Sequence, residues 1–95
     1  MITSAPRAKL RSMANSLEPI IYVGKEGITE GIISQVDDAL EARELIKGSV
    51  QQNCDYTARE VVDALAEELG AEPVQAIGRK FVLYRRSEKK PKIEL

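Results

Sequence analysis

The sequence predicts a two-layer α/β domain, in which three helices lie on one side of a four-stranded mixed sheet. In some segments apolar residues recur at helical spacing, and in others they form short β-branched runs. Along the chain these patterns predict the order helix, strand, helix, strand, helix, strand, strand. The first strand–helix–strand unit favours parallel strands, and the last two strands favour a hairpin. We place one domain at residues 1–86 and expect residues 87–95 to form a charged, mobile tail.

The first half of the chain contains two helices and one strand. The first helix begins at Thr3 or Ser4 and has a buried stripe at helical spacing, formed by Leu10, Met13, Ala14 and Leu17. Residues 20–23 form a strand, because four consecutive apolar residues of this kind are typical of a buried strand. The second helix spans about residues 29–43, with a threonine at its start as the cap.

The second half of the chain contains the remaining strands and the third helix. Residues 45–50 form a strand, in which Gly48 is a weak position because it has no side chain to pack. The helix at residues 57–69 has the clearest apolar stripe, a capping box at its start and a glycine after its end. Residues 73–77 and 80–85 form the hairpin around a glycine turn.

A short loop with a glycine at each end, Gly24-Lys25-Glu26-Gly27, joins the first strand to the second helix. Such a loop exposes backbone N–H groups at the positive end of a helix dipole, where an anion such as phosphate binds well. Lys25 adds a positive charge at the tip, and Glu26 opposes it. The spacing alone is more typical of a structural turn, so a turn and a phosphate site are both open interpretations.

The composition excludes several classes of function. The chain has no histidine, which is the commonest general base and metal ligand. The side chains of adjacent acids such as Asp37 and Asp38 point in different directions on a helix, which argues against a catalytic pair of carboxylates. We therefore expect no enzyme, no metal and no cofactor. The single cysteine, Cys54, fits a reducing compartment. No apolar run is long enough for a signal peptide or a membrane span, so we expect a cytoplasmic protein without membrane contact.

The charge is distributed unevenly, although the net charge is only −1. Residues 1–11 are basic, residues 37–72 are mainly acidic, and the chain is again mainly basic from Arg79 onward. A field of this kind can orient a domain on a polyanion through one face. Whether the two basic ends of the chain meet on one face stays open.

Three stretches give the chain a specific resemblance to a known family: residues 17–31, 39–47 and 74–85. In their order and spacing they resemble the YhbY-type bacterial RNA-binding proteins, which are stand-alone CRM (chloroplast RNA splicing and ribosome maturation) domains. The resemblance implies a fold like the C-terminal domain of translation initiation factor three. It also implies RNA binding, and an association of bacterial members with precursors of the large ribosomal subunit.

In this family the glycine loop is compared with the backbone-clamping loop of KH domains, which favours phosphate contact over a plain turn. The chain departs from the family at Glu26, where a neutral or basic residue is usual, and at Gly48, where a β-branched residue is usual. The first departure weakens the expected hold on phosphate. The second puts the stability of that strand in doubt.

We therefore expect a non-enzymatic protein that contacts ribosomal RNA, or the precursor of the large ribosomal subunit, as a monomer. The expected phosphate contacts are Gly24, Lys25, Glu26, Gly27, Arg7, Arg11, Arg79, Lys80 and Arg85. Tyr22 and Tyr84 are candidates for base stacking, although core packing is the favoured role of both. The alternative is a protein-interaction module whose acidic helices dock on a ribosomal protein or an assembly factor.

Overall fold

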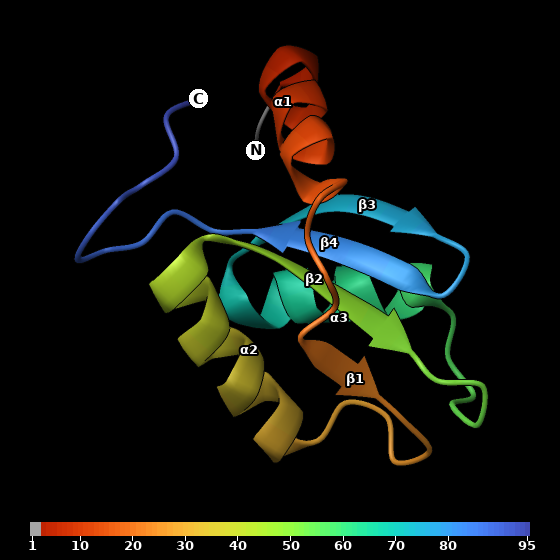
Figure 1. Cartoon of the computed structure of the whole chain (residues 1–95). Helices are drawn as coiled ribbons and strands as arrows, with labels where there is room; N and C mark the ends of the chain where they lie inside the picture. Colours follow the sequence, from red (N-terminus) through yellow and green to blue (C-terminus); the bar gives the residue numbers. More distant parts are fainter. Residues whose placement is uncertain (1–2) are drawn as a thin grey trace.

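The computed structural model describes residues 3–95 and has the predicted order of helices and strands (Figure 1). Its three helices are α1 (Ser4–Ala14), α2 (Glu30–Arg43) and α3 (Ala58–Leu69). Its four strands are β1 (Ile21–Val23), β2 (Leu45–Val50), β3 (Glu72–Ile77) and β4 (Lys80–Tyr84). The capping signals of α2 and α3 are confirmed, since Thr29 caps α2 and Thr57 forms a capping box with Glu60 at the start of α3. At the start of α1, Thr3 occupies the cap position but makes no side-chain cap hydrogen bond.

The four strands form one mixed sheet in the order β1-β2-β4-β3. β1 and β2 are parallel, whereas β4 is antiparallel to both of its neighbours. Val23 pairs with Val50, and Lys80 pairs with both Ser49 and Ile77. The ends of β1 and β2 and the β3–β4 turn therefore lie at one end of the sheet, which we call the loop end. The opposite end, where β2 and β3 begin and β4 finishes, is called the far end.

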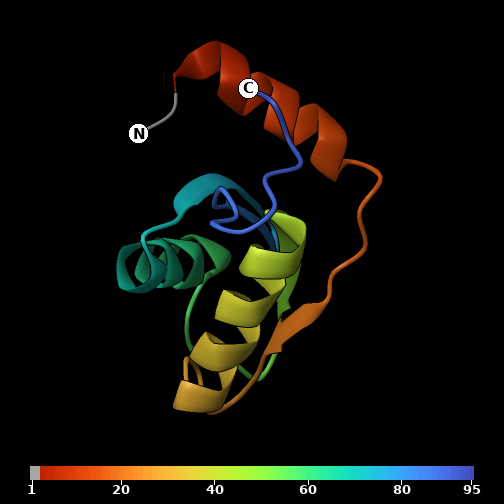
Figure 2. The ribbon, with the colours of Figure 1, turned by 90° about the vertical axis from the view of Figure 1, so that its left-hand side faces the viewer.

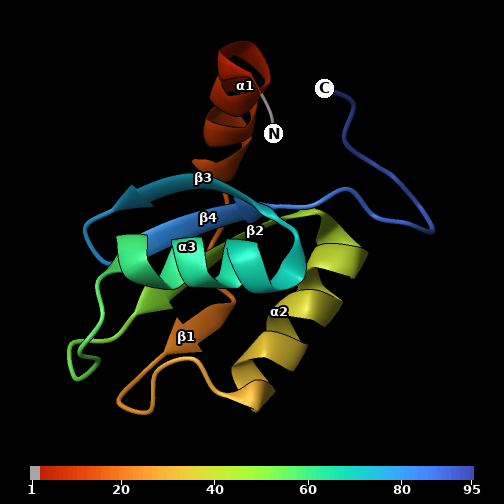
Figure 3. The ribbon, with the colours of Figure 1, turned by 180° about the vertical axis from the view of Figure 1, so that it is seen from behind.

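Helices α2 and α3 cover one face of the sheet and enclose the larger part of the core (Figure 3). Phe81 and Leu83 of β4 point into this core, as do Val36 and Leu40 of α2. From α3 the buried side chains are spaced at helical intervals along one stripe: Ala58, Val61, Val62, Leu65 and Ala66. This half of the fold is the predicted two-layer arrangement.

The prediction that all three helices lie on one side is wrong for α1, which covers the opposite face of the sheet (Figure 2). Leu10 and Ala14 of α1 pack there against Val82 and Tyr84 of β4. Because alternate residues of a strand point to opposite faces, β4 is buried on both sides. The uninterrupted apolar run of β4 is typical of such a strand, and it is the signal for a helix on each face.

Gly48 is not a weak position in β2, because its space is filled from the neighbouring strand. Gly48 pairs directly with Phe81, and a Cβ atom added to it would lie 2.2 Å from the Phe81 Cζ atom. The aromatic ring thus lies over the glycine and is itself fully buried. Covering a strand glycine with an aromatic ring from the next strand is a known stabilising device in sheets.

The segment after β4 has no helix or strand, yet it contacts two glutamates of the second helical region. The Glu44 carboxylate, which is fully buried, accepts hydrogen bonds from the backbone N–H groups of Ser87, Lys92 and Ile93 at 2.6–2.7 Å. Glu41 accepts from the Ser87 hydroxyl and from the Glu88 N–H. These contacts argue against the expected mobile tail, and they extend the folded part beyond residue 86.

The tail contacts also change the ionisation of both carboxyls. Burial alone would raise the pKa of Glu44, but the three N–H donors and the nearby Arg86 charge outweigh it, so the pKa is lowered. The Ser87 hydroxyl and the Glu88 N–H lower the pKa of Glu41. A lowered pKa in the folded state means that ionisation stabilises the fold above the ordinary glutamate pKa. This contribution is lost as the pH falls through the lowered value.

We predict that Gly48→Val destabilises the protein, because the new side chain overlaps the Phe81 ring. The free energy of unfolding should fall by about 1–3 kcal/mol, as measured by urea denaturation. Adding Phe81→Leu to Gly48→Val should recover part of the loss, although Phe81→Leu alone destabilises. Gly31→Ala in α2 is the control, because its added Cβ meets only ordinary contacts and favours a helix. A Gly48→Val variant as stable as the parent would contradict the packing argument.

We predict that deleting residues 87–95 lowers the melting temperature at pH 7 by about 4 °C or more, because the ionised Glu44 carboxylate loses the three N–H donors that stabilise it. The deficit should shrink at an acidic pH below the lowered pKa of Glu44, where the carboxyl is protonated in the truncated and the full-length protein alike. Scanning calorimetry at both pH values measures it.

The matched control for the deletion is Lys89→Ala with Lys90→Ala, which removes charge from the tail but keeps every backbone N–H group. This variant should melt at the parent temperature. A truncated protein that also melts at the parent temperature would restore the mobile-tail interpretation.

Candidate nucleic-acid interface

The Gly24–Gly27 loop is a tight turn between β1 and α2, and its second glycine is required by the geometry. The Gly27 N–H donates to the Gly24 carbonyl oxygen at 3.0 Å, and Gly27 has a φ of 71°, which favours glycine. A Cβ atom at Gly27 would also lie 3.2 Å from the Tyr56 ring. The turn leaves Lys25 and Glu26 exposed at its tip.

Two other segments meet this loop at the loop end of the sheet. The Gln51 N–H donates to the Val23 carbonyl oxygen at 2.8 Å, and a Cβ atom at Gly24 would lie 2.7 Å from the Gln51 side chain. Arg79, in the β3–β4 turn, donates from its Nη1 to the Gln51 carbonyl oxygen at 3.5 Å. The exposed cations Lys25, Arg79 and Lys80 therefore lie at the loop end of the sheet.

The predicted cations of α1 are not part of this group. Arg7 donates to the Pro73 carbonyl oxygen and forms an ion pair with Glu72 at 3.6 Å, so it links α1 to the far end of β3. Arg11, one turn later, is partly buried. Lys9 on the same helix donates to the Glu94 carbonyl oxygen, and Figure 2 shows the C-terminal segment beside α1. Arg7 therefore contacts the start of β3 and Lys9 contacts the tail, apart from the β3–β4 turn.

Arg85 also lies apart from the loop, at the far end of β4. Its guanidinium forms an ion pair with the Asp37 carboxylate at 2.8 Å and donates to the Leu69 carbonyl oxygen at 3.2 Å. It thus ties β4 to α2 and to the end of α3, which is a structural role. Of the nine expected contacts, the loop end collects six: Gly24, Lys25, Glu26, Gly27, Arg79 and Lys80.

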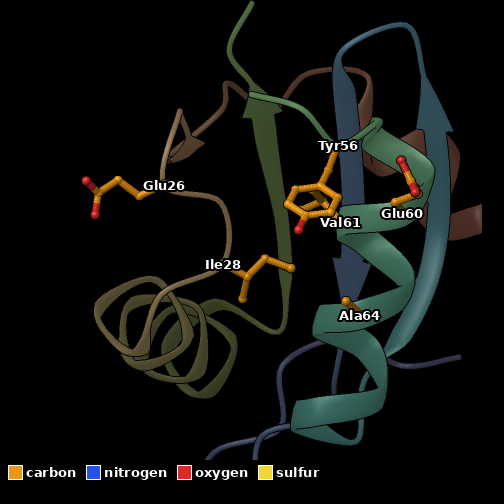
Figure 4. A pocket seen from close by; sticks show the side chains of 6 residues that line it. All are labelled: Glu26, Ile28, Tyr56, Glu60, Val61 and Ala64. Carbon is orange, nitrogen blue, oxygen red and sulfur yellow. The ribbon is translucent and has the colours of Figure 1, made fainter. Parts of the chain in front are cut away.

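A pocket of about 390 Å³ opens beside the loop, between it and the first half of α3 (Figure 4). Its lining consists of Glu26, Ile28, Tyr56, Glu60, Val61 and Ala64. Ile28 points toward the Tyr56 ring and Val61, whereas the Glu26 side chain points away from the pocket (Figure 4). The pocket is thus apolar inside with the Glu60 carboxylate at its edge, which is unfavourable for a phosphate.

Tyr56 was not among the residues that the sequence singled out, although its ring is 55% exposed. Its position in a polar connection, directly before the capping box of α3, is the only sequence signal for this exposure. The two tyrosines considered earlier differ from each other. Tyr84 is buried in the core beneath α1, as favoured, whereas Tyr22 is 54% exposed and lies outside the core.

The part of the chain that the structure describes contains no cluster of three metal-ligating side chains. Across residues 3–95, no helix is long and apolar enough to span a membrane. What the loop end offers is a tight glycine turn that leads into a helix, and three exposed cations on neighbouring segments: Lys25, Arg79 and Lys80. This chemistry suits the phosphates of a polyanion.

Comparison with known proteins gives a consistent result. The family model of the CRS1 / YhbY (CRM) domain matches residues 2–85. The chain is 45% identical to the "Probable RNA-binding protein YqeI" of Bacillus subtilis over 95 residues, which is 100% of this chain and 99% of that protein. It is 38% identical to an "RNA-binding protein" of Haemophilus influenzae over 86 residues, covering 90% of this chain and 86% of the relative.

A solved structure has the same fold over the whole chain. It is the "Solution structure of the hypothetical protein SAV1595 from Staphylococcus aureus, a putative RNA binding protein". The two chains are 44% identical, with a TM-score of 0.83, and the match covers 100% of this chain and 99% of the other.

Proposed function

Because this chain belongs to the CRS1 / YhbY (CRM) domain family, we propose that it is a non-enzymatic RNA-binding protein acting in assembly of the large ribosomal subunit. The relatives named as RNA-binding proteins support the first part of this proposal. The ribosomal role rests on the family resemblance. The RNA it contacts would be ribosomal RNA.

The observation that carries the proposal is the meeting of three segments at the loop end. The glycine loop brings Lys25, and the β3–β4 turn brings Arg79 and Lys80 to the same end of the sheet. Phosphate contacts of this kind position a protein on RNA without reading its sequence. Arg7, Arg11 and Arg85 are left out of the proposed contact, because they lie elsewhere.

The alternative, a protein-docking surface on the acidic helices, loses support from the structure. Three acidic residues of that region are used within the molecule: Asp37 pairs with Arg85, and Glu41 and Glu44 bind the tail. A carboxylate that already forms an ion pair or hydrogen bonds within the molecule contributes less to the binding of a basic partner.

Two further points complete the proposal. We place the protein in the cytoplasm, because Cys54 is its single cysteine and is unpaired. We also propose that it acts as a monomer.

The proposed function is tested by the salt dependence of RNA binding. With three cations each neutralising about one phosphate, log K should fall with log salt by a slope of roughly 2 on single-stranded RNA. Fluorescence anisotropy with a ribosomal RNA fragment at several salt concentrations measures the slope. The pair Arg79→Ala with Lys80→Ala should lower this slope. Arg43→Ala, which removes an exposed arginine at the end of α2 and at the far end of the sheet, is the matched control and should leave the slope unchanged. A flat salt response would contradict phosphate-dominated binding.

The loop is tested by replacing both tip residues with aspartate, Lys25→Asp with Glu26→Asp. Folding should be retained, because both glycines remain and acids suit the start of a helix. RNA affinity should fall about tenfold or more, because the phosphate loses an ammonium and meets two carboxylates. Circular dichroism and RNA titration measure the two effects.

A companion variant tests the same loop in the opposite direction. Glu26→Lys should strengthen RNA binding, because it removes the negative charge at the tip. Glu67→Lys makes the same charge change on an exposed position of α3 and should strengthen binding less. The loop has no role in binding if the double aspartate variant folds normally and binds RNA as tightly as the parent.

A further inference from the structure

One corner of the sheet face that carries α1 has no helix over it (Figure 1). The connection from α1 crosses this face toward β1, and the uncovered corner lies at the loop end (Figure 1). Strand pairing places one residue from each strand in a row there: Tyr22, Ser49, Lys80 and Ile77. Paired residues point to the same face of a sheet, and their neighbours Ile21 and Phe81 point into the core under α2 and α3.

The row has a large apolar surface that the fold leaves in contact with solvent. Tyr22 is 54% exposed and Ile77 is 65% exposed. The Tyr22 hydroxyl donates to the Pro19 carbonyl oxygen at 3.1 Å, which restricts the ring to one orientation. A ring that is already oriented loses little conformational entropy when a flat ligand stacks on it.

The charges around the row have the sign that favours RNA. Lys80 lies in the row, Arg79 lies in the adjacent turn, and Lys47 lies on the same face two residues before Ser49. None of the four residues in the row is acidic. The other exposed tyrosine, Tyr56, has the opposite surroundings, since the Glu60 carboxylate lies at the edge of its pocket.

We propose that this corner is a binding site for one unpaired base of the RNA, stacked on Tyr22. The proposal rests on the proposed RNA-binding function and adds a base contact to it. Tyr22 and Lys80 are two strand spacings apart, or about 10 Å, so the phosphates flanking a base on Tyr22 can reach Lys80 and Arg79. Stacking on an aromatic ring beside cations is a common way to hold single strands without sequence preference.

The experiment compares two ten-nucleotide probes by fluorescence anisotropy: an oligoadenylate, and an abasic oligomer with the same phosphates. The parent protein should bind the oligoadenylate roughly fivefold or more tightly. Tyr22→Val keeps a good strand residue but removes the ring. It should abolish this difference while leaving affinity for the abasic oligomer unchanged. Tyr22→Phe should retain most of the difference.

The matched control is Tyr56→Val, which removes a tyrosine of nearly equal exposure from the opposite face and should keep the full difference. Because the chain has no tryptophan, tyrosine fluorescence adds a second readout. Oligoadenylate should quench it in the parent and in Tyr56→Val but not in Tyr22→Val.

Each contrary result has a distinct meaning. If the parent binds both probes equally, or if Tyr22→Val keeps the difference, the base site is disproved and phosphate binding stands. If Tyr56→Val alone abolishes the difference, the base lies in the acidic-edged pocket and our assignment is wrong. If neither probe binds, the proposed function fails as well.

Discussion

The pairing of β2 with β4 at the centre of the sheet is the constraint on which the rest of the fold depends. Both strands have neighbours on each edge, and β4 is buried on both faces. Phe81 fits this centre only because Gly48 leaves room for its ring. The two faces then need separate covers, which α2 and α3 supply on one side and α1 supplies on the other. The same pairing sets the register that brings the β3–β4 turn to the glycine loop.

Elements with local signals could be predicted from the sequence. The caps of α2 and α3, the glycine turns and the apolar stripe of α3 each depend on residues within a few positions of one another, and they form as expected. The signals of α1 were less accurate, because Thr3 makes no side-chain cap hydrogen bond and Met13 of the predicted buried stripe is exposed. The side of the sheet that α1 covers could not be predicted in the same way. It depends on Val82 and Tyr84, far along the chain, because these side chains make the second face of β4 apolar and α1 covers it.

In the candidate site too, features that depend on neighbouring residues could be predicted, and features that depend on residues far along the chain could not. The Gly24–Gly27 loop could be predicted because its turn geometry depends on four consecutive residues. Arg7 and Arg85 were expected to contact RNA because nothing near them in the sequence neutralises them. Their partners are 65 and 48 residues away, at Glu72 and Asp37, which only the fold brings close. Tyr22 was undecided for a related reason, because strand alternation does not show which face is covered.

The positions of these charges explain how a chain with a net charge of −1 can present a basic surface. At the far end of the sheet, charges neutralise one another or bind backbone groups: Arg7 with Glu72, Arg85 with Asp37, and Glu44 with the tail. At the loop end, Lys25, Arg79 and Lys80 stay exposed on turns. Turns at strand ends suit this purpose, because they add charge without burying it. Several of the acids that balance the total, Asp37, Glu44 and Glu72 among them, are thus used in holding the fold together. At the loop end the cations lie near two exposed acids, Glu26 in the glycine loop and Asp55 beside Arg79.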